Sequence, residues 1–237
     1  MFASARLKAV IAISKMVADD LVRHYAYPRE RIHHIPNGID LDRFHPSLRR
    51  HRTGMRRKLD VPDDYHVVLF VGTGFSRKGL DVAIDAVARL KNRAELWVVG
   101  RDRRPNHYLS LANKAGLSGR YRYFGPQADP LPWYGAADVT ILPSSYEPFG
   151  LTALESMACG VPSVVSKHCG VREVVEQFDP ALVCNADNTD EVVQALELAL
   201  DMAFRPEISE RIRATAKRYG LDQMIERSIR LYAELQN

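Results

Sequence analysis

Residues 66–90 read HVVLFVGTGFSRKGLDVAIDAVARL, and they contain one complete strand-loop-helix unit. The run HVVLFVG (66–72) is short and continuously apolar, which is typical of a strand buried on both faces of a sheet. In segment 78–90, apolar residues recur every three or four positions, so this segment predicts a helix with one apolar face. A buried strand that leads directly into an amphipathic helix favours a parallel sheet.

The same alternation extends along the chain in both directions. Downstream, we expect strands at 95–100, 121–125, 138–143 and 162–166, and helices at 106–115, 131–137, 148–159 and 189–203. Segments 171–176 and 181–184 continue the alternation, and 206–236 should be helical with a break near Gly220. Upstream, we expect a strand at 8–14, a helix at 15–25 and an extended segment at 31–35. The predicted fold class is α/β, a doubly wound, Rossmann-like parallel sheet.

The composition is that of an ordinary globular protein. The chain has 237 residues, of which 46% are hydrophobic and 26% charged, enough for one sizeable core. No apolar run reaches the roughly 18 residues of a membrane span, so we expect a cytoplasmic protein, with peripheral contact to the inner face of the membrane left open. The three cysteines have no CxxC spacing, so we expect packed thiols rather than a zinc site or disulfides: Cys159, Cys169 and Cys184.

Two basic clusters account for much of the formal charge of +4. One lies in 49–58, expected to be a loop or an exposed helix, and the other comprises Arg101, Arg103 and Arg104. They favour either a solvated surface or contact with an anionic partner, such as a phosphate-bearing acceptor or a lipid headgroup. We expect no nucleic-acid partner, because interleaved aromatic residues and a recognition element are lacking.

Functional side chains of a doubly wound sheet lie in loops beyond the carboxyl ends of its strands. The first such loop is GTGFSRKG (72–79), where Gly72 and Gly74 permit close approach of a ligand to the backbone. Arg77 and Lys78 add positive charge where a diphosphate would meet a helix N-terminus. The pattern matches neither the dinucleotide fingerprint nor a Walker A loop. It leaves two interpretations open: a phosphate site, or a tight turn with two solvated basic residues.

A second such loop is EPFGLTALE (147–155). The amides of Phe149, Gly150 and Leu151 can face an anion, with the dipole of the following helix behind them. Glu155, one turn into that helix, can accept two hydrogen bonds from a vicinal diol such as ribose, and Glu147 can meet sugar hydroxyls. The alternative is a helix whose acidic residues serve only its own dipole.

The segment from Glu147 to Glu155 resembles the E-x7-E motif of the family-four retaining glycosyltransferases. IPNGID (35–40), VGTGFSRKG (71–79) and MACGVPSVVS (157–166) are similar to the same family. The resemblance covers essentially the whole chain, but only the C-terminal half of a usual member. VGTGFSRKGLD followed by VVGRDRRP (98–105) looks closest to bacterial lipopolysaccharide core glucosyltransferases.

The resemblance implies roles for the matching residues. Lys78 would hold the donor diphosphate, Glu155 the ribose hydroxyls and Glu147 the transferring sugar. The arginine common after the first loop glycine is Thr73 here, so Arg77 would have to supply the charge. Arg101 matches a position around the base but equally fits an exposed surface. The remaining donor-binding candidates are Gly72, Gly74, Tyr123, Phe124, Phe149, Gly150, Leu151 and Thr152.

The resemblance also implies a reaction and an architecture. The implied reaction is transfer of a hexose, with glucose as the expected sugar, from a UDP-sugar to a glycan or lipopolysaccharide-type acceptor, with retention and without a metal or other cofactor. The architecture is the C-terminal half of a GT-B fold whose N-terminal acceptor half is absent. Residues 1–35 would be a remnant of that half, 36–220 the nucleotide-sugar domain, and 221–237 a helix crossing back. Apolar surface exposed at both ends predicts self-association.

Two other functions were weighed against transfer. A stand-alone nucleotide-sugar-binding module would bind the donor without turnover. A sugar-nucleotide epimerase of related fold would not explain the spacing from Glu147 to Glu155.

Overall fold

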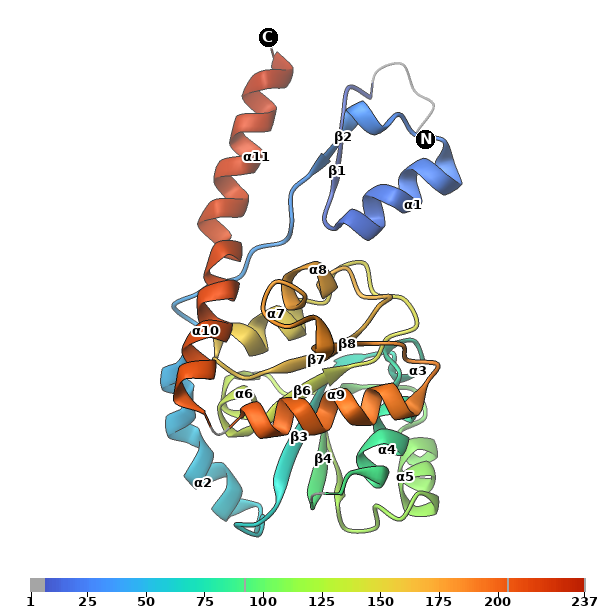
Figure 1. Cartoon of the computed structure of the whole chain (residues 1–237), viewed down its shortest axis with the longest axis vertical. Helices are drawn as coiled ribbons and strands as arrows, with labels where there is room; N and C mark the ends of the chain where they lie inside the picture. The colour runs from blue at the N-terminus through green and yellow to red at the C-terminus, as the bar shows by residue number, and fades with distance from the viewer. Residues whose placement is uncertain (1–6, 92, 204, 237) are drawn as a thin grey trace.

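Six parallel strands form the central sheet, in the order β5-β4-β3-β6-β7-β8 (Figure 1). The computed structural model describes residues 7–91, 93–203 and 205–236. Every neighbouring pair of strands in this sheet is parallel, which confirms the predicted α/β, Rossmann-like fold. The strands are β3 (His66–Thr73), β4 (Ala94–Arg101), β5 (Tyr121–Gly125), β6 (Val139–Leu142), β7 (Ser163–Ser166) and β8 (Val183–Cys184).

Helices connect the strands and cover the sheet. The helix α4 (Leu80–Arg89) packs against α5 (Pro105–Lys114) and α9 (Thr189–Met202). Elsewhere α7 (Leu151–Ala158) packs against α10 (Pro206–Ala216), and α6 (Leu131–Ala136) against α2 (His51–Lys58). Short elements complete the chain: α3 (Phe75–Lys78), α8 (Arg172–Val175) and the 3-10 helices η1 (Arg29–Arg31), η2 (Pro46–Arg50), η3 (Pro180–Leu182) and η4 (Lys217–Tyr219).

Two predicted helices begin later than expected, and a glycine is the reason in both cases. The helix expected from Lys78 begins at Leu80, because Gly79 has φ 75° and separates it from the single turn of α3. The helix expected from Pro148 begins at Leu151, because Gly150 has φ 105°. A left-handed residue interrupts a right-handed helix, so each loop ends at its glycine.

The core beneath these helices is continuous, and its largest fully buried side chains include Trp97, Tyr134, Phe70 and Phe75. The three cysteines are free and buried, as expected. Burial raises the pKa of Cys159 and of Cys184 to about 12, so neither thiol is ionised near neutral pH.

The basic segment 49–58 is partly internal. Nη1 of Arg52 lies 2.6 Å from Oδ1 of buried Asp138, and Nη1 of Arg56 lies 3.0 Å from Oδ2 of the same residue. Arg49 donates to the carbonyl of Ala137 at 2.7 Å. Both interpretations of this cluster, solvated surface and anionic-partner contact, are therefore wrong for Arg56, whose partner lies 82 positions away. Other arginines of the segment, Arg50 and Arg57, are exposed.

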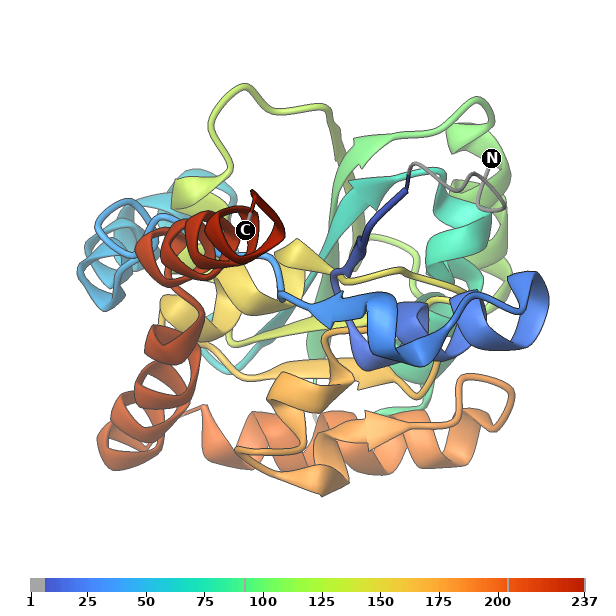
Figure 2. The ribbon, with the colours of Figure 1, turned by 90° about the horizontal axis from the view of Figure 1, so that it is seen from above.

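The N-terminal segment has a small sheet and a small core of its own. The strands β1 (Val10–Ala12) and β2 (Ile32–His34) are parallel, and α1 (Lys15–Tyr25) connects them. Ser14 caps the start of α1, since its hydroxyl accepts from the amide of Val17. Viewed from above, this segment lies across the carboxyl end of the main sheet (Figure 2).

The last helix, α11 (Leu221–Gln236), stands beside this segment (Figure 1). It follows the expected break at Gly220, and Nζ of Lys8 donates to the carbonyl of Leu235 at 2.6 Å. None of the helices within the described residues has the length and apolarity needed to cross a bilayer.

Candidate functional site

The order of the strands places two loops side by side at the carboxyl end of the sheet. From β3 the connections run outward to β4 and β5, and from β6 they run the other way to β7 and β8. The loops after β3 and β6 therefore meet at the point where ligands bind in such sheets. They are joined directly, because the amide of Ser145 donates to the carbonyl of Arg77 at 3.0 Å.

Lys78 crosses the first loop toward the second. Its side chain lies against Gly72, where an added Cβ would come within 2.2 Å of the lysine Cδ. Its Nζ is 2.8 Å from Oε2 of Glu147, and the side chain is only 12% exposed. Lys78 is therefore not a solvated residue of a tight turn, and that interpretation of the first loop is wrong for this side chain.

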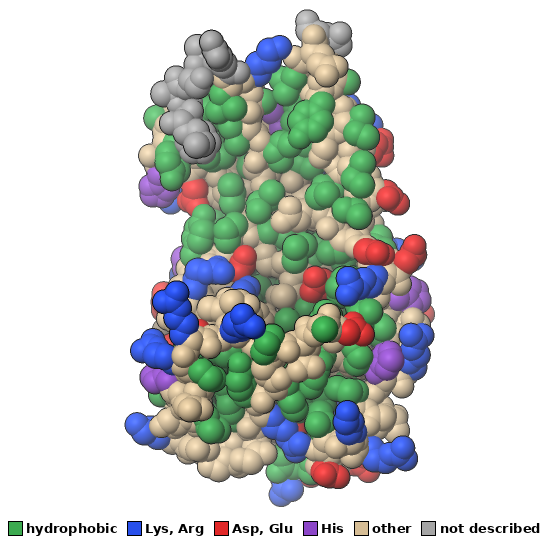
Figure 3. All heavy atoms as spheres, turned by 180° about the vertical axis from the view of Figure 1, so that it is seen from behind, with side chains coloured by type: hydrophobic (Ala, Val, Ile, Leu, Met, Phe, Trp, Pro, Cys, Tyr) green, Lys and Arg blue, Asp and Glu red, His purple; other side chains and the backbone are tan. Residues whose placement is uncertain are grey.

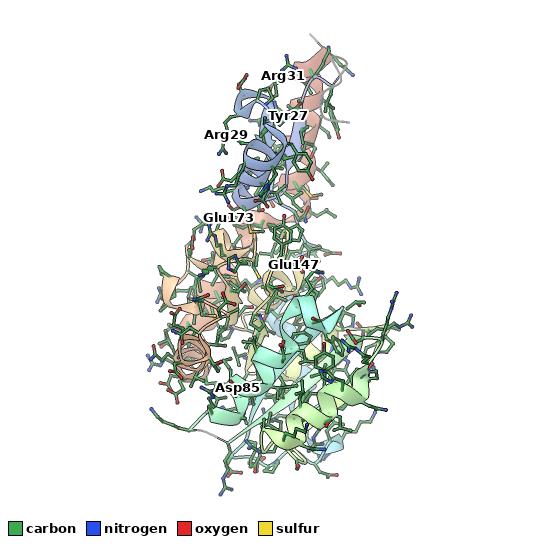
Figure 4. The ribbon with its side chains drawn as sticks, turned by 90° about the vertical axis from the view of Figure 1, so that its right-hand side faces the viewer. Tyr27, Arg29, Arg31, Asp85, Glu147 and Glu173 are labelled. Atoms are coloured by element: carbon green, nitrogen blue, oxygen red, sulfur yellow. The ribbon has the colours of Figure 1, made fainter. Side chains whose placement is uncertain are left out.

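Arg77 approaches the same carboxylate from outside. Its Nη1 lies 3.2 Å from Oε2 of Glu147 and donates to the carbonyl of Tyr146 at 2.7 Å. The side chain is 48% exposed, so water reaches this half of the cluster. Figure 4 shows Glu147 between the sheet and the N-terminal segment.

The electrostatics of Glu147 follow from these contacts. Burial raises the pKa of Glu147, but hydrogen bonds and positive charge from Lys78 and Arg77 outweigh it, and the pKa lies below its ordinary value of 4.5. Glu147 is therefore a carboxylate at neutral pH, paired with both cations.

The second loop is held on its other side by the segment after β7. The amide of Glu147 donates to the carbonyl of His168 at 3.0 Å, and the amide of Gly170 donates to the carbonyl of Glu147 at 2.9 Å. A Cβ at Gly150 would lie 2.9 Å from Leu142 and 3.0 Å from Val171, so the chain passes through a tight space there.

The helix α7 begins at Leu151, directly after this tightly packed turn. Within the described residues, the amides of Leu151 and Thr152 have no hydrogen-bond acceptor, as is usual in the first turn of a helix. An anion beside them would also meet the positive end of the helix dipole. Phe149 as a whole is buried, and its carbonyl accepts a hydrogen bond from the amide of Val171.

Glu155 lies one turn into α7, half-buried. Its Oε2 accepts a hydrogen bond of 2.6 Å from the hydroxyl of Tyr134. Burial raises the pKa of Glu155, whereas the bond from Tyr134 and the charges of Arg43 and Lys78 oppose that rise. Lys78 lies in the loop after β3 and Glu155 in α7, which follows β6, so both residues lie toward the carboxyl end of the sheet.

Three further donor-binding candidates, Arg101, Tyr123 and Phe124, lie in different environments. Arg101 is exposed at the end of β4, and its carbonyl accepts from the amide of Gly74 at 3.1 Å. Tyr123 is 36% exposed, and its hydroxyl donates to the carbonyl of Gly100 at 3.2 Å. The ring of Phe124 is partly exposed and packs against Trp97 and Trp133, with centroids 5.6 and 4.4 Å apart, so the core fixes its position.

Three contributors to the site were missed in the sequence. Asp102 accepts from the amides of Phe75 and Arg104, each at 2.8 Å, and so fixes the start of the first loop. Its position directly after β4 could have identified it. Tyr134 and Ser145 gave no local signal, because each acts through a contact across 21 or more positions.

A metal site has no obvious ligand set in residues 7–236, positions 92 and 204 aside. Within them, no group of three or more His, Cys, Asp or Glu side chains is placed to hold a metal ion. The absence of a cofactor stays a prediction.

Comparisons with known proteins were made for the whole chain. A family model described as "Glycosyl transferases group 1" matches residues 51–219, and one described as "Glycosyltransferase Family 4" matches residues 1–43. A D-inositol 3-phosphate glycosyltransferase from Xylanimonas cellulosilytica is 34% identical over 239 residues, which cover 95% of this chain and 57% of that protein. The chain thus spans little more than half the length of the curated relatives it matches.

Two solved structures are similar to the fold. WaaG, a glycosyltransferase involved in lipopolysaccharide biosynthesis, is 27% identical with a TM-score of 0.79, over 92% of this chain and 60% of that one. HepE from Anabaena, solved in complex with UDP-glucose, is 23% identical with a TM-score of 0.83, over 96% of this chain and 64% of that one. The HepE likeness concerns the fold alone.

Proposed function

Because the chain belongs to the glycosyl transferases group 1 family, we propose that it binds the nucleotide-sugar donor of a retaining hexosyltransferase. The donor is a UDP-sugar, with glucose as the first candidate. The chain forms the donor-binding half of the active site, and an acceptor-binding half completes it. The transferase names of the relatives favour this function over a binding module without turnover.

One observation carries the proposal. Two cations, Lys78 and Arg77, converge on the carboxylate of Glu147, which lies four positions before the start of α7. A diphosphate there meets fixed positive charge on one side and unpaired amides on the other. In this proposal Glu155, one turn further into α7, binds the ribose, and Glu147 binds the transferring sugar.

The chemistry follows from where charge develops. The bond from the anomeric carbon to the diphosphate oxygen breaks, and its electron pair goes to the diphosphate. The acceptor oxygen forms the new bond from the same face, and its proton goes to the departing phosphate oxygen. Lys78, Arg77 and the α7 amides stabilise the negative charge without reorganising, so this reaction requires no metal.

The acceptor is a glycan or a lipopolysaccharide-type molecule in this proposal. The names of the relatives point to different acceptors, since one contains D-inositol 3-phosphate and the other concerns lipopolysaccharide biosynthesis. An acceptor screen should therefore include both classes. We place the reaction in the cytoplasm, with contact to the inner face of the membrane where the acceptor is lipid-linked.

We further infer that residues 1–35 belong to the acceptor half and that 221–237 return toward it. In support, the family-four model matches residues 1–43, and β1, β2 and α1 share a core separate from the main one. Three apolar residues on α11, Ile225, Ile229 and Tyr232, are 44%, 62% and 58% exposed. Figure 3 shows hydrophobic side chains gathered over this end of the molecule. By itself the chain should self-associate through this surface, which sedimentation over a range of concentrations tests.

Ligand-dependent thermal stability tests the donor site. We expect UDP or a UDP-hexose to raise the melting temperature more than GDP, ADP or their hexose conjugates. Lys78→Ala and Glu155→Ala should each weaken binding in calorimetry, whereas Lys114→Ala, at an exposed position on α5, should not. Unchanged affinity in both site variants contradicts the proposal.

A further inference from the structure

A buried tyrosine on α6 reaches the carboxylate assigned to the ribose. Tyr134 is completely buried, and its ring packs edge-on against Phe44, with centroids 5.8 Å apart. Its hydroxyl lies 2.6 Å from Oε2 of Glu155. The ring is thus fixed by the core, while the hydroxyl points at a residue of the site.

The phenol is the donor in this bond. Burial, and next the charge of Glu155, raise the pKa of Tyr134 well above its ordinary value of 10, so the hydroxyl keeps its proton. A carboxylate offers about four lone-pair positions on its two oxygens, and this bond takes one of them. Oε1 of Glu155 has no hydrogen-bond partner in the described part of the chain, which leaves it free to accept from hydroxyls of a ligand.

The same bond opposes the effect of burial on Glu155. Burial disfavours the charged form of this residue, and the Tyr134 hydroxyl is the first of the groups that favour it, ahead of Arg43 and Lys78. Tyr134 therefore fixes the direction of the carboxylate and helps keep it an acceptor.

We propose that Tyr134 is a positioning residue through which the site selects nucleotides with an intact ribose diol. The inference rests on the proposed function, in which Glu155 meets the ribose. A nucleotide without 2′ and 3′ hydroxyls leaves the half-buried, oriented carboxylate of Glu155 without hydrogen-bond donors. A site that uses such a carboxylate to bind hydroxyls discriminates strongly against a ligand that lacks them. Without the Tyr134 hydroxyl, Glu155 can turn away or take a proton, and this discrimination falls.

Calorimetry with two nucleotides tests the proposal: UDP and 2′,3′-dideoxyuridine 5′-diphosphate. The variant is Tyr134→Phe, which keeps the ring and removes the hydroxyl. The matched control is Tyr121→Phe, because Tyr121 is also buried and its hydroxyl has no hydrogen-bond partner among the described residues.

The parent chain and Tyr121→Phe should bind UDP at least about tenfold more tightly than the dideoxy analogue, as expected for hydrogen bonds to a charged group. Tyr134→Phe should lose most of this preference: its UDP affinity falls, and its affinity for the analogue stays within about twofold of the parent. If both affinities fall equally, or if the preference is unchanged, the proposed role of Tyr134 is wrong.

The results separate this inference from the function on which it rests. If the parent chain binds none of UDP, GDP and ADP, the proposed donor site is wrong. If the parent binds UDP and the dideoxy analogue equally tightly, the proposed role of Glu155 is wrong. Melting temperatures of the unliganded variants show whether a substitution lowers the stability of the whole fold. In a Glu155→Gln background, Tyr134→Phe should remove no further preference, because the two residues act as one unit; a second, independent loss there overturns the coupling.

Discussion

Each end of the sheet holds one carboxylate between two cations, but the two clusters differ in access to water. At the amino end, Asp138 is 1% exposed and pairs with Arg52 and Arg56. It also accepts from the amide of Val67 at 2.8 Å, so both of its oxygens are bonded within the protein. At the carboxyl end, Glu147 pairs with Lys78 and with the half-exposed Arg77.

The surroundings, rather than the charges, decide what each cluster does. The Asp138 cluster lies under α2 and fastens a basic helix to the sheet. The Glu147 cluster lies between two loops that end at left-handed glycines, Gly79 and Gly150, and Arg77 is half-exposed there. The first cluster is therefore structural, and the second is the one for which we propose donor binding.

The largest expected effect is on the structural cluster. Asp138→Asn leaves Arg56 without its counter-charge in a buried position, and breaking a buried pair in this way costs about 3–5 kcal/mol. Urea denaturation should show that loss, while UDP affinity of the folded variant stays close to the parent value. A stability change below about 1 kcal/mol would contradict the contrast between the two ends.

Lys78→Met tests the binding cluster with a side chain of similar length and no charge. UDP affinity should fall roughly ten- to hundredfold, the loss expected for a hydrogen bond to a charged group, and calorimetry measures it. Exposed Lys114→Met is the control. A variant that binds UDP as the parent does would show that Lys78 serves only Glu147.

Glu147→Gln should change UDP affinity less than Lys78→Met does, and in the opposite direction. It removes a negative charge that competes with a diphosphate for Lys78 and Arg77, so UDP should bind a few-fold more tightly. Its stability should fall by only about 1 kcal/mol, because Gln can still accept from Lys78 and water reaches Arg77. Weaker UDP binding in this variant would mean that Glu147 must aim the cations.

Acidic pH should abolish the difference in stability between the Glu147→Gln variant and the parent. The pKa of Glu147 is lowered in the folded state, so its pairing stabilises the protein above the ordinary value of 4.5 and stops doing so as the pH falls through the lowered pKa. Melting temperatures of parent and variant should therefore converge at acidic pH. A constant difference from pH 7 down to pH 3 would assign the effect to packing.

The fold was largely predictable because its signals are local. Buried strands such as 66–72 and helical periodicity such as 80–90 are visible within one window of sequence. The helix starts at 80 and 151 were missed because a single left-handed glycine sets each of them. Helical periodicity continues through such a glycine and does not reveal it.

The site was predictable only in part, because part of it depends on distant contacts. Lys78, Glu147 and Glu155 could be placed together because loops after neighbouring parallel strands meet at one edge. Arg56 looked like a surface residue because its partner is 82 positions away, and Tyr134 carried no signal for the same kind of reason.

The loop from Glu147 to Gly150 is fastened on three sides. Its neighbours are Ser145, bonded to Arg77, the segment 168–170, and Ser14, whose hydroxyl donates to the carbonyl of Pro148 at 2.8 Å. A ligand therefore meets a template that is already rigid, and little conformational entropy is lost when it docks. The heat capacity change of nucleotide binding should accordingly be small, reflecting the surface that is covered rather than any folding of the chain.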